Sequence, residues 1–480
     1  MSLKQKTIKG LFWSGASQAG KQISQFIITA ILARLLSPND FGLLAMATVF
    51  INFGMIFSEM GISSALIQKQ DTHDRHFYSA FWLNVVVGVV LTLIFIAISP
   101  LIAWFYKKPE LQIILTVISV NYFISSFVVI QQTILTKEMD FKSLAIRDII
   151  AIILSGGVGI FMAYHGFGVW SLVFQSVVFT LSNAILLWTL SSWRPKFQFA
   201  KSDIKDIFKF GANITGFNIV NYFARNIDQL LIGKFLGSQA LGYYSLAYKI
   251  LLYPLQFMSG VIVRVVFPAF SKLQNNIDKL RISYMKMIKF LSLITFPMIF
   301  VLYGISTEFI LTIFGSKWAP VITLFKIFAF CGPFQSLITV NGTIYLSIGR
   351  SDVQFRMQLI GTLVTTICVI FGLQYGVVGV AFAYTIQSIL YLQYALFVSR
   401  SMICLKSKDF YSLLKAPLLI SSIIIILLYI YKIIFSHFSY PQIVYTSLPL
   451  CLIAYIVLLF VFKEIGVKNN RIKIQLIESY

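Results

Sequence analysis

The segment NIVNYFARNIDQLLIGKFLGSQALGYYSLA, from Asn218 to Ala247, places a cation and a carboxylate inside an otherwise apolar stretch. Its polar residues would form one narrow stripe on an α-helix, made of Asn218, Asn221, Arg225 and Asp228. A charge at the centre of a bilayer costs about 2.5 to 3.5 kcal/mol on insertion scales, so such a stripe is expected to face a bundle interior or a wet cavity. The alternative is that Arg225 and Asp228 only neutralise each other along the helix.

A similar pattern lies 200 residues earlier in the chain. The stretch ILARLLSPNDFGLLAMA, from Ile31, aligns without a gap with LIGKFLGSQALGYYSLA, from Leu231. The alignment pairs Arg34 with Lys234, Leu36 with Leu236, Gly42 with Gly242 and Ala47 with Ala247, and upstream it pairs Gln18, Lys21 and Gln25 with Asn218, Asn221 and Arg225. Agreement in identity, polarity and turn position predicts an internal repeat. We therefore expect two similar halves and an extension.

The composition is that of a polytopic membrane protein. Of the 480 residues, 58% are hydrophobic and 12% charged, and the mean hydropathy is +0.83. The net charge of +22 does not indicate nucleic-acid binding, because the sequence contains no soluble face to carry a basic stripe. Four cysteines without a short common spacing indicate neither a disulfide framework nor a zinc site. No cleavable signal peptide is recognisable.

Hydrophobic runs of about 20 residues predict an all-α protein with about fourteen transmembrane helices. We place them at 10–35, 41–61, 77–105, 111–135, 143–164, 168–190, 207–233, 241–266, 284–305, 320–347, 356–374, 377–399, 417–436 and 442–462. The repeat then predicts an N-terminal six-helix lobe (1–190), a cytoplasmic linker (191–209), a C-terminal six-helix lobe (210–400) and a two-helix extension with a cytoplasmic tail (401–480).

Most Lys and Arg residues between these helices fall in alternate loops, among them Lys137, Lys142 and Arg147. The positive-inside rule therefore places both termini in the cytoplasm. We expect a multi-pass protein of the cell (inner) membrane. The opposite loops are short, so we expect no external domain. The basic loops are best explained as topology determinants in contact with anionic membrane lipids.

Cations outnumber carboxylates within the predicted helices, which suits an anionic substrate in a cleft of low dielectric constant. The predicted substrate-binding cations are Lys21, Arg225, Lys249, Arg264 and Lys326. The predicted polar lining consists of Gln18, Gln25, Asn52, Asn218, Asn221 and Gln256, and the candidates for ion coupling are Asp228 and Glu59. Arg34 and Arg264 lie near helix ends, so an alternative for both is contact with lipid headgroups.

Other kinds of site find little support. The histidines at 73 and 76 beside Asp71 and Asp74 lie in a short exposed loop, so we expect no metal there. The sequence contains no Walker A motif, dinucleotide fingerprint or Ser-His-Asp arrangement. We therefore expect neither a cofactor nor an enzyme. Tyrosines such as Tyr243 and Tyr248 are more typical of interfacial anchors than of sugar platforms.

Five stretches together resemble the MOP exporter superfamily, and within it the Wzx-type polysaccharide flippases of the colanic-acid and teichuronic-acid exporter type. They are FWSGASQ around Trp13, ILARLLSPNDFGLLAMA from Ile31, GISSALIQ from Gly61, RNIDQLLIGKFLGSQALGYYSLAYKI from Arg225 and FPAFSKLQ from Phe267. The resemblance covers both halves. Each motif is degenerate alone, and their order and spacing carry the likeness.

The resemblance implies two six-helix lobes around a central cavity and transport of an undecaprenyl-diphosphate-linked oligosaccharide by alternating access, for O-antigen, capsule or exopolysaccharide synthesis. It also implies that Lys21, Arg225 and Lys249 meet the diphosphate, although several relatives have arginine where this chain has Lys21. Polysaccharide polymerase or assembly proteins would be partners. The alternatives are a drug or cation antiporter of the same superfamily, a membrane polysaccharide polymerase or ligase, and a scaffold subunit.

Overall fold

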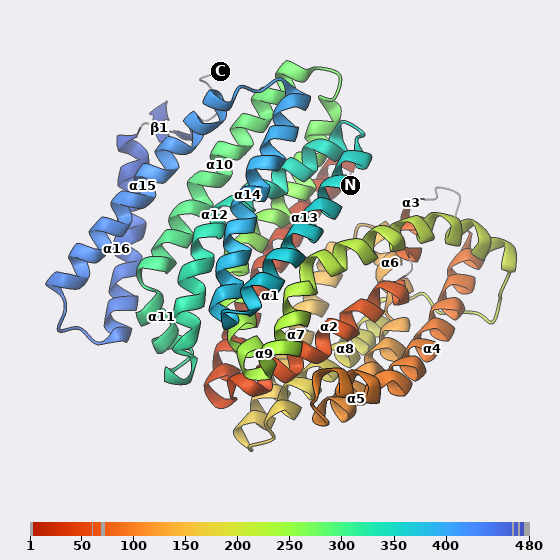
Figure 1. Ribbon diagram of the computed structural model, residues 1–480. Helices are drawn as coiled ribbons and strands as arrows, with labels where there is room; N and C mark the ends of the chain where they lie inside the picture. Colours follow the sequence, from red (N-terminus) through yellow and green to blue (C-terminus); the bar gives the residue numbers. More distant parts are fainter. Residues whose placement is uncertain (1–2, 60, 69–72, 463–464, 469–470, 475–480) are drawn as a thin grey trace. The chain divides into compact units, whose positions relative to one another are not determined.

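The computed structural model describes residues 3–462 apart from residues 60 and 69–72, together with residues 465–468 and 471–474 (Figure 1). At some of these positions, including residues 201–215 and 256–265, only the backbone is described. The chain divides into two compact units, residues 1–242 and 243–480. The regular structure of the membrane-spanning part is helical, which confirms the predicted fold class.

The helices of the first unit are α1 (Leu3–Leu35), α2 (Pro38–Glu59), α3 (Ile62–Gln68), α4 (Asp74–Tyr106), α5 (Glu110–Ser126), α6 (Val129–Lys137), α7 (Phe141–Tyr164) and α8 (Val169–Leu190). Helix α9 (Lys201–Lys272) begins in the first unit and continues into the second. The second unit continues with α10 (Ile277–Gly304), α11 (Ser306–Ile313), the 3₁₀ turn η1 (Ser316–Trp318), α12 (Pro320–Ser347), α13 (Ser351–Leu373), α14 (Gly376–Ile403), α15 (Ser407–Ile434) and α16 (Tyr440–Val461). A short antiparallel hairpin of β1 (Ile465–Lys468) and β2 (Arg471–Ile474) follows.

Ten helices in the described chain are long and apolar enough to cross a bilayer. The pair α5 and α6, bent by 42°, makes an eleventh span if it is counted as one. The remaining predicted spans lie in α1 and in the two parts of α9, which carry the predicted cations Lys21, Arg225 and Lys249. The multi-pass membrane class is therefore clear, whereas the count of fourteen stays a prediction.

The helix breaks follow the 200-residue repeat. Helix α1 ends at Leu35 and α2 begins at Pro38, while α9 consists of two helices that meet at Gly237, where φ is 85°. Glycine adopts this left-handed backbone without a steric penalty. In the first copy the corresponding residue, Ser37, closes the turn differently, because its backbone N–H donates to the Asp40 carboxylate at 2.9 Å. The same helix–turn–helix shape is thus built with two local devices.

Two aligned glycines allow the two copies of this turn to touch within the first unit. A Cβ placed on Gly42 would lie 1.7 Å from the carbonyl oxygen of Ser238, and one placed on Gly242 would lie 1.9 Å from that of Pro38. Ser238 is the aligned counterpart of Pro38, so each copy offers the other the same pair of positions. The Ser238 hydroxyl also donates to the Asn39 side chain. This reciprocal contact is what a two-fold relation between the copies produces.

The first part of α9 packs on α2 and α4. The Tyr222 hydroxyl donates to the backbone carbonyl of Val49, and the Phe53 ring lies 5.2 Å from that of Phe223. The Lys234 ammonium lies 4.4 Å from the centre of the Phe105 ring and donates to the same residue's carbonyl. These contacts explain why the first compact unit extends to Gly242. The lobe boundaries drawn from the repeat stay a prediction.

The linker segment 191–200 is fastened to the first unit. The indole N–H of Trp82 donates to the Lys196 carbonyl at 2.9 Å, and the Trp82 ring stacks on Phe197 at 4.6 Å. The backbone N–H of Ala200 donates to the Ser79 hydroxyl at 3.1 Å. Aromatic pairs of this kind add about 0.5–1.5 kcal/mol beyond their buried area. The segment therefore packs against α4 in a fixed position.

The C-terminal pair α15 and α16 belongs to the second unit, where α15 packs on α10 and α16 on α11 (Figure 1). One ion pair ties α15 to this unit: the Lys432 ammonium lies 2.6 Å from the Glu308 carboxylate and donates to the Gly304 carbonyl at 3.0 Å. Glu308 is buried, so its charge depends on that partner.

Alanine at Gly42 or Gly242 should destabilise the protein by about 1–3 kcal/mol, because a methyl group there overlaps a backbone carbonyl that cannot move without shifting a helix. Gly157→Ala is the control, since a Cβ at that helical position meets nothing within 4 Å. Thermal unfolding of the detergent-purified variants measures both effects. Equal midpoints for all three variants would contradict the close contact.

Lys432→Ala should destabilise the second unit by about 3–5 kcal/mol, because it leaves the Glu308 carboxylate buried without its counter-ion. The double variant Lys432→Met with Glu308→Gln should recover most of that loss, since it removes both charges together. Lys415→Ala, at an exposed position of the same helix, serves as the control. Thermal unfolding again gives the readout, and a single variant as stable as the control would refute the prediction.

Candidate functional site

The polar stripe of α1 meets a buried ion pair on α7. The Lys21 ammonium forms a salt bridge with the Asp148 carboxylate, and its side chain keeps 33% of its surface exposed. Gln18 is half-buried and Gln25 is exposed on the same helix. Because α1 packs on α7, this contact fixes how the stripe is oriented within the first unit.

Asp148 has a second cationic partner, its neighbour Arg147. The Arg147 Nε–H donates to Asp148 Oδ1 at 2.9 Å, and the Nη2 group pairs with the same oxygen. The Nη1 group donates to the Gln132 side chain at 3.0 Å. Both Arg147 and Asp148 are only 6% exposed. The cluster of Lys21, Arg147 and Asp148 therefore carries a net charge of +1 within one helical bundle.

A cavity of about 250 Å³ lies beside this cluster, between α2, α3, the bend from α5 to α6, α7 and α8. Its lining includes the polar residues Ser58, Ser125, Gln132, Arg147, Asp148 and Asn183. Asn183 is 7% exposed, and its amide donates to the Phe179 carbonyl at 2.9 Å. Its Oδ1 atom has no hydrogen-bond partner among the described residues. A polar cavity with an unsatisfied buried oxygen is a typical place for bound water.

The predicted stripe of α9 has an exposed and a buried end. Asn218 and Arg225 are exposed, Asn221 is half-buried, and Asp228 is only 3% exposed. Asn52, on α2, is exposed as well. Arg225 therefore retains the accessibility that a ligand-binding cation requires, whereas Asp228 lies within the packed part of the helix.

In the second unit, Lys249 on α9 and Lys326 on α12 are both half-buried. The two helices are in contact through aromatic side chains, since the Phe328 ring lies 5.2 Å from Tyr244 and 5.6 Å from Tyr248. The predicted residues Arg264, Gln256 and Glu59 have side chains outside the described part of the structure. That all the predicted residues line one cavity stays a prediction.

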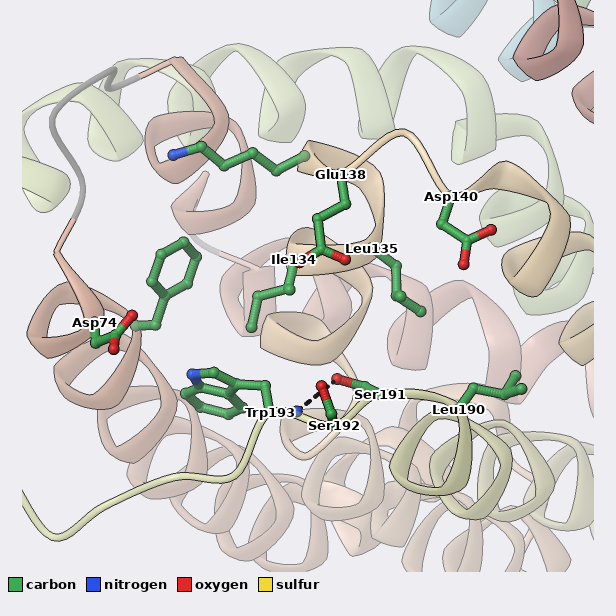
Figure 2. Close-up of a pocket in the computed structure, with 11 residues that line it drawn as sticks. Asp74, Ile134, Leu135, Glu138, Asp140, Leu190, Ser191, Ser192 and Trp193 are labelled. Atoms are coloured by element: carbon green, nitrogen blue, oxygen red, sulfur yellow. Dashed lines mark hydrogen bonds between the residues drawn. The ribbon is translucent and has the colours of Figure 1, made fainter. Parts of the chain in front are cut away.

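A larger cavity, of about 560 Å³, lies where α4, the end of α6 and the start of the linker meet (Figure 2). Three carboxylates surround it, those of Asp74, Glu138 and Asp140, against one cation, Lys137. Asp140 caps α7 by accepting from the Ser143 N–H at 3.2 Å, and Lys137 donates to the Leu66 carbonyl at 3.2 Å. Because carboxylates outnumber cations around this cavity, it is poorly suited to a phosphate group. Within the described residues, no group of three His, Cys, Asp or Glu side chains could hold a metal ion.

The family model described as "Polysaccharide biosynthesis protein" matches residues 31–323. The chain belongs to this family. It is 30% identical to the teichuronic acid biosynthesis protein TuaB of Bacillus subtilis, covering 91% of each chain. It is 26% identical to the lipopolysaccharide biosynthesis protein WzxC of Escherichia coli, covering 81% of this chain and 80% of that one. Among solved structures it is similar to the lipid II flippase MurJ in an inward closed conformation, with a TM-score of 0.77, 18% identity and coverage of 94% and 98%.

The family model and the relative WzxC confirm the resemblance to Wzx-type polysaccharide biosynthesis proteins. The cluster of Lys21, Arg147 and Asp148 is therefore a feature of a polysaccharide biosynthesis protein. The likeness to MurJ concerns the fold, because the identity is low.

The pair Arg147–Asp148 is a candidate site that the sequence alone does not reveal. The position of Arg147 indicates a basic loop, but α7 begins six residues earlier and buries its side chain. One signal is nonetheless present, because an Arg–Asp pair next to the apolar run IIAIIL is as unusual as the charges of α9. The partner across the bundle, Lys21, could not be read from the sequence.

Proposed function

We propose that this protein is a flippase that moves undecaprenyl-diphosphate-linked oligosaccharide repeat units across the cytoplasmic membrane for surface polysaccharide synthesis. The proposal rests mainly on two accessible cations on helices that also have apolar faces. Lys21 is half-buried and Arg225 is exposed. Membership of the polysaccharide biosynthesis family supports the class of cargo. The MurJ-like fold supports the class of transport.

The diphosphate is the part of the cargo that this chain recognises in the proposal. A phosphate group attracts accessible cations strongly in a site of low dielectric constant. In this proposal the predicted cations Lys21, Arg225, Lys249, Arg264 and Lys326 supply the positive charge. The predicted amide side chains of Gln18, Gln25, Asn52, Asn218, Asn221 and Gln256 bind the first sugars. The prenyl tail stays in the lipid, so the membrane itself is a binding partner. Polymerase or assembly proteins would take the cargo afterwards.

Transport proceeds by alternating access between the two sides of the membrane. The lobes predicted at residues 1–190 and 210–400 are the moving bodies, the segment 191–209 joins them, and residues 401–480 form the extension. Both termini lie in the cytoplasm, as the distribution of basic loops predicts. The protein itself catalyses no bond-making step in this proposal.

Arg225→Ala should lower transport at least tenfold, because an exposed guanidinium on the stripe contributes a charge-assisted contact to the diphosphate. The assay uses proteoliposomes with undecaprenyl-diphosphate oligosaccharide and scores the glycan that becomes accessible outside. Arg356→Ala, which removes an exposed cation at the start of α13, should transport normally. Normal transport by Arg225→Ala would move the binding site elsewhere. No transport by the unmodified protein with several glycans would favour the antiporter alternative.

Asp228→Asn should abolish the dependence of transport on membrane potential. Asp228 is a buried carboxylate on a helix within the membrane, and moving one charge through 100 mV contributes about 2.3 kcal/mol. The measurement compares transport rates in proteoliposomes with and without a potassium diffusion potential. Asp74→Asn, at an exposed position, is the control. If the variant keeps the full voltage dependence, Asp228 has no part in coupling.

A further inference from the structure

Lys21 is the movable member of the cluster on α1 and α7. Its side chain is 33% exposed, whereas those of Arg147 and Asp148 are each 8% exposed. Arg147 is fixed by three contacts, two to the Asp148 carboxylate and one to the Gln132 side chain. A lysine ammonium is a compact charge on a flexible stem, so it can change partners by rotation about its own side-chain bonds. Packing therefore holds Arg147 and Asp148 in place, whereas Lys21 remains partly accessible.

Arg147 lowers the free energy needed to separate Lys21 from Asp148. Removing the partner of a buried carboxylate is usually costly, because it leaves an uncompensated charge in a medium of low dielectric constant. Here the guanidinium stays on Asp148 Oδ1 when Lys21 leaves, so the remaining pair is neutral. The second oxygen, Oδ2, is the one that Lys21 occupies. Two cations on one carboxylate therefore provide one permanent counter-ion and one that can be released.

The adjoining cavity can satisfy the oxygen that Lys21 vacates. It is lined by Asp148 itself, and its volume of about 250 Å³ exceeds the roughly 30 Å³ that one water occupies in the liquid. The Asn183 Oδ1 atom, buried and without a partner among the described residues, is a second acceptor at the same cavity. Water in this cavity would solvate both oxygens.

We propose that Asp148 is an internal competitor for Lys21: it holds the ammonium while the transport site is empty and yields it to a phosphate group of the cargo. This inference rests on the proposed function for the identity of the anion. Asp148 acts on the cargo only through Lys21 and is therefore a positioning residue. On cargo binding, the Lys21 ammonium exchanges its carboxylate partner for a phosphate group. It therefore has an anionic partner both before and after the cargo binds.

The competition also favours release. A transport site must bind its cargo strongly enough to load it and weakly enough to unload it. Recapture of Lys21 by Asp148 withdraws one cation from the diphosphate and so lowers the barrier to its departure. Without Asp148, the cation would hold the cargo more tightly and slow the cycle.

The test is a double-mutant cycle on Lys21→Met and Asp148→Asn in the full-length protein, with inorganic diphosphate as the probe and calorimetry as the measurement. Asp148→Asn should raise the affinity about tenfold in the parent protein and leave it unchanged in the Lys21→Met background, because the gain acts through Lys21. A general change in electrostatic field would raise the affinity in both backgrounds. Asp74→Asn controls for the loss of one carboxylate in the same unit.

A second readout does not depend on a measurable affinity in every variant. The rate at which an amine-acylating reagent modifies Lys21, followed by mass spectrometry, should rise in Asp148→Asn and fall again when inorganic diphosphate is added. In Arg147→Gln the rate should fall below that of the parent protein, because Asp148 then has Lys21 as its only counter-ion. Size-exclusion profiles and unfolding midpoints exclude misfolding as the cause.

The outcomes separate this inference from the proposed function. Equal affinity and equal Lys21 reactivity in Asp148→Asn and the parent protein would overturn the exchange, even if proteoliposomes transport the lipid-linked glycan. The same holds if no variant binds diphosphate and diphosphate does not protect Lys21. Absence of glycan transport by the parent protein, measured separately, counts against the proposed function.

Discussion

The cost of placing a charge in a medium that cannot solvate it governs the arrangement of this protein. Every charged side chain on a membrane helix needs a counter-ion, a wet surface or a route to the lipid headgroups. Asp148 and Glu308, both buried, satisfy the condition with cationic partners: Arg147, which is buried, and Lys432, which is half-buried. Arg225 satisfies it by remaining exposed. These different solutions divide the charges into those that hold helices together and those that remain available to a ligand.

The repeat supplies the second constraint, because two copies of one turn must fit against each other. The reciprocal approach of Gly42 to Ser238 and of Gly242 to Pro38 is possible only where side chains are absent. Small residues serve the same purpose wherever membrane helices cross closely. The break of α9 at Gly237 lies next to this contact, within the first unit.

The charged groups have different consequences for transport. A pair such as Glu308 and Lys432, with one cation for one carboxylate, is stable and structural. A cluster such as Lys21, Arg147 and Asp148, with two cations for one carboxylate, has a spare charge. In a polysaccharide biosynthesis protein whose proposed cargo is a lipid diphosphate, that spare charge is placed on the more exposed side of the cluster. Binding energy and reversibility then come from the same few side chains.

The membrane class, the helical fold, the repeat and the family can all be read from the sequence alone, because they depend on hydrophobic run length and on aligned residues that lie close along the chain. The sequence also marks Lys21, Arg225 and Asp228 as unusual, since charges in apolar helices stand out without any knowledge of contacts. Which charges are paired becomes visible only in the folded chain. Arg147 reads as one more basic residue near a loop until α7 buries it, and its bond to Asp148 gains meaning when Lys21 arrives from a helix more than a hundred residues away. Pairing across a bundle depends on helix rotation and crossing, which the packing of all side chains sets together and no single segment encodes.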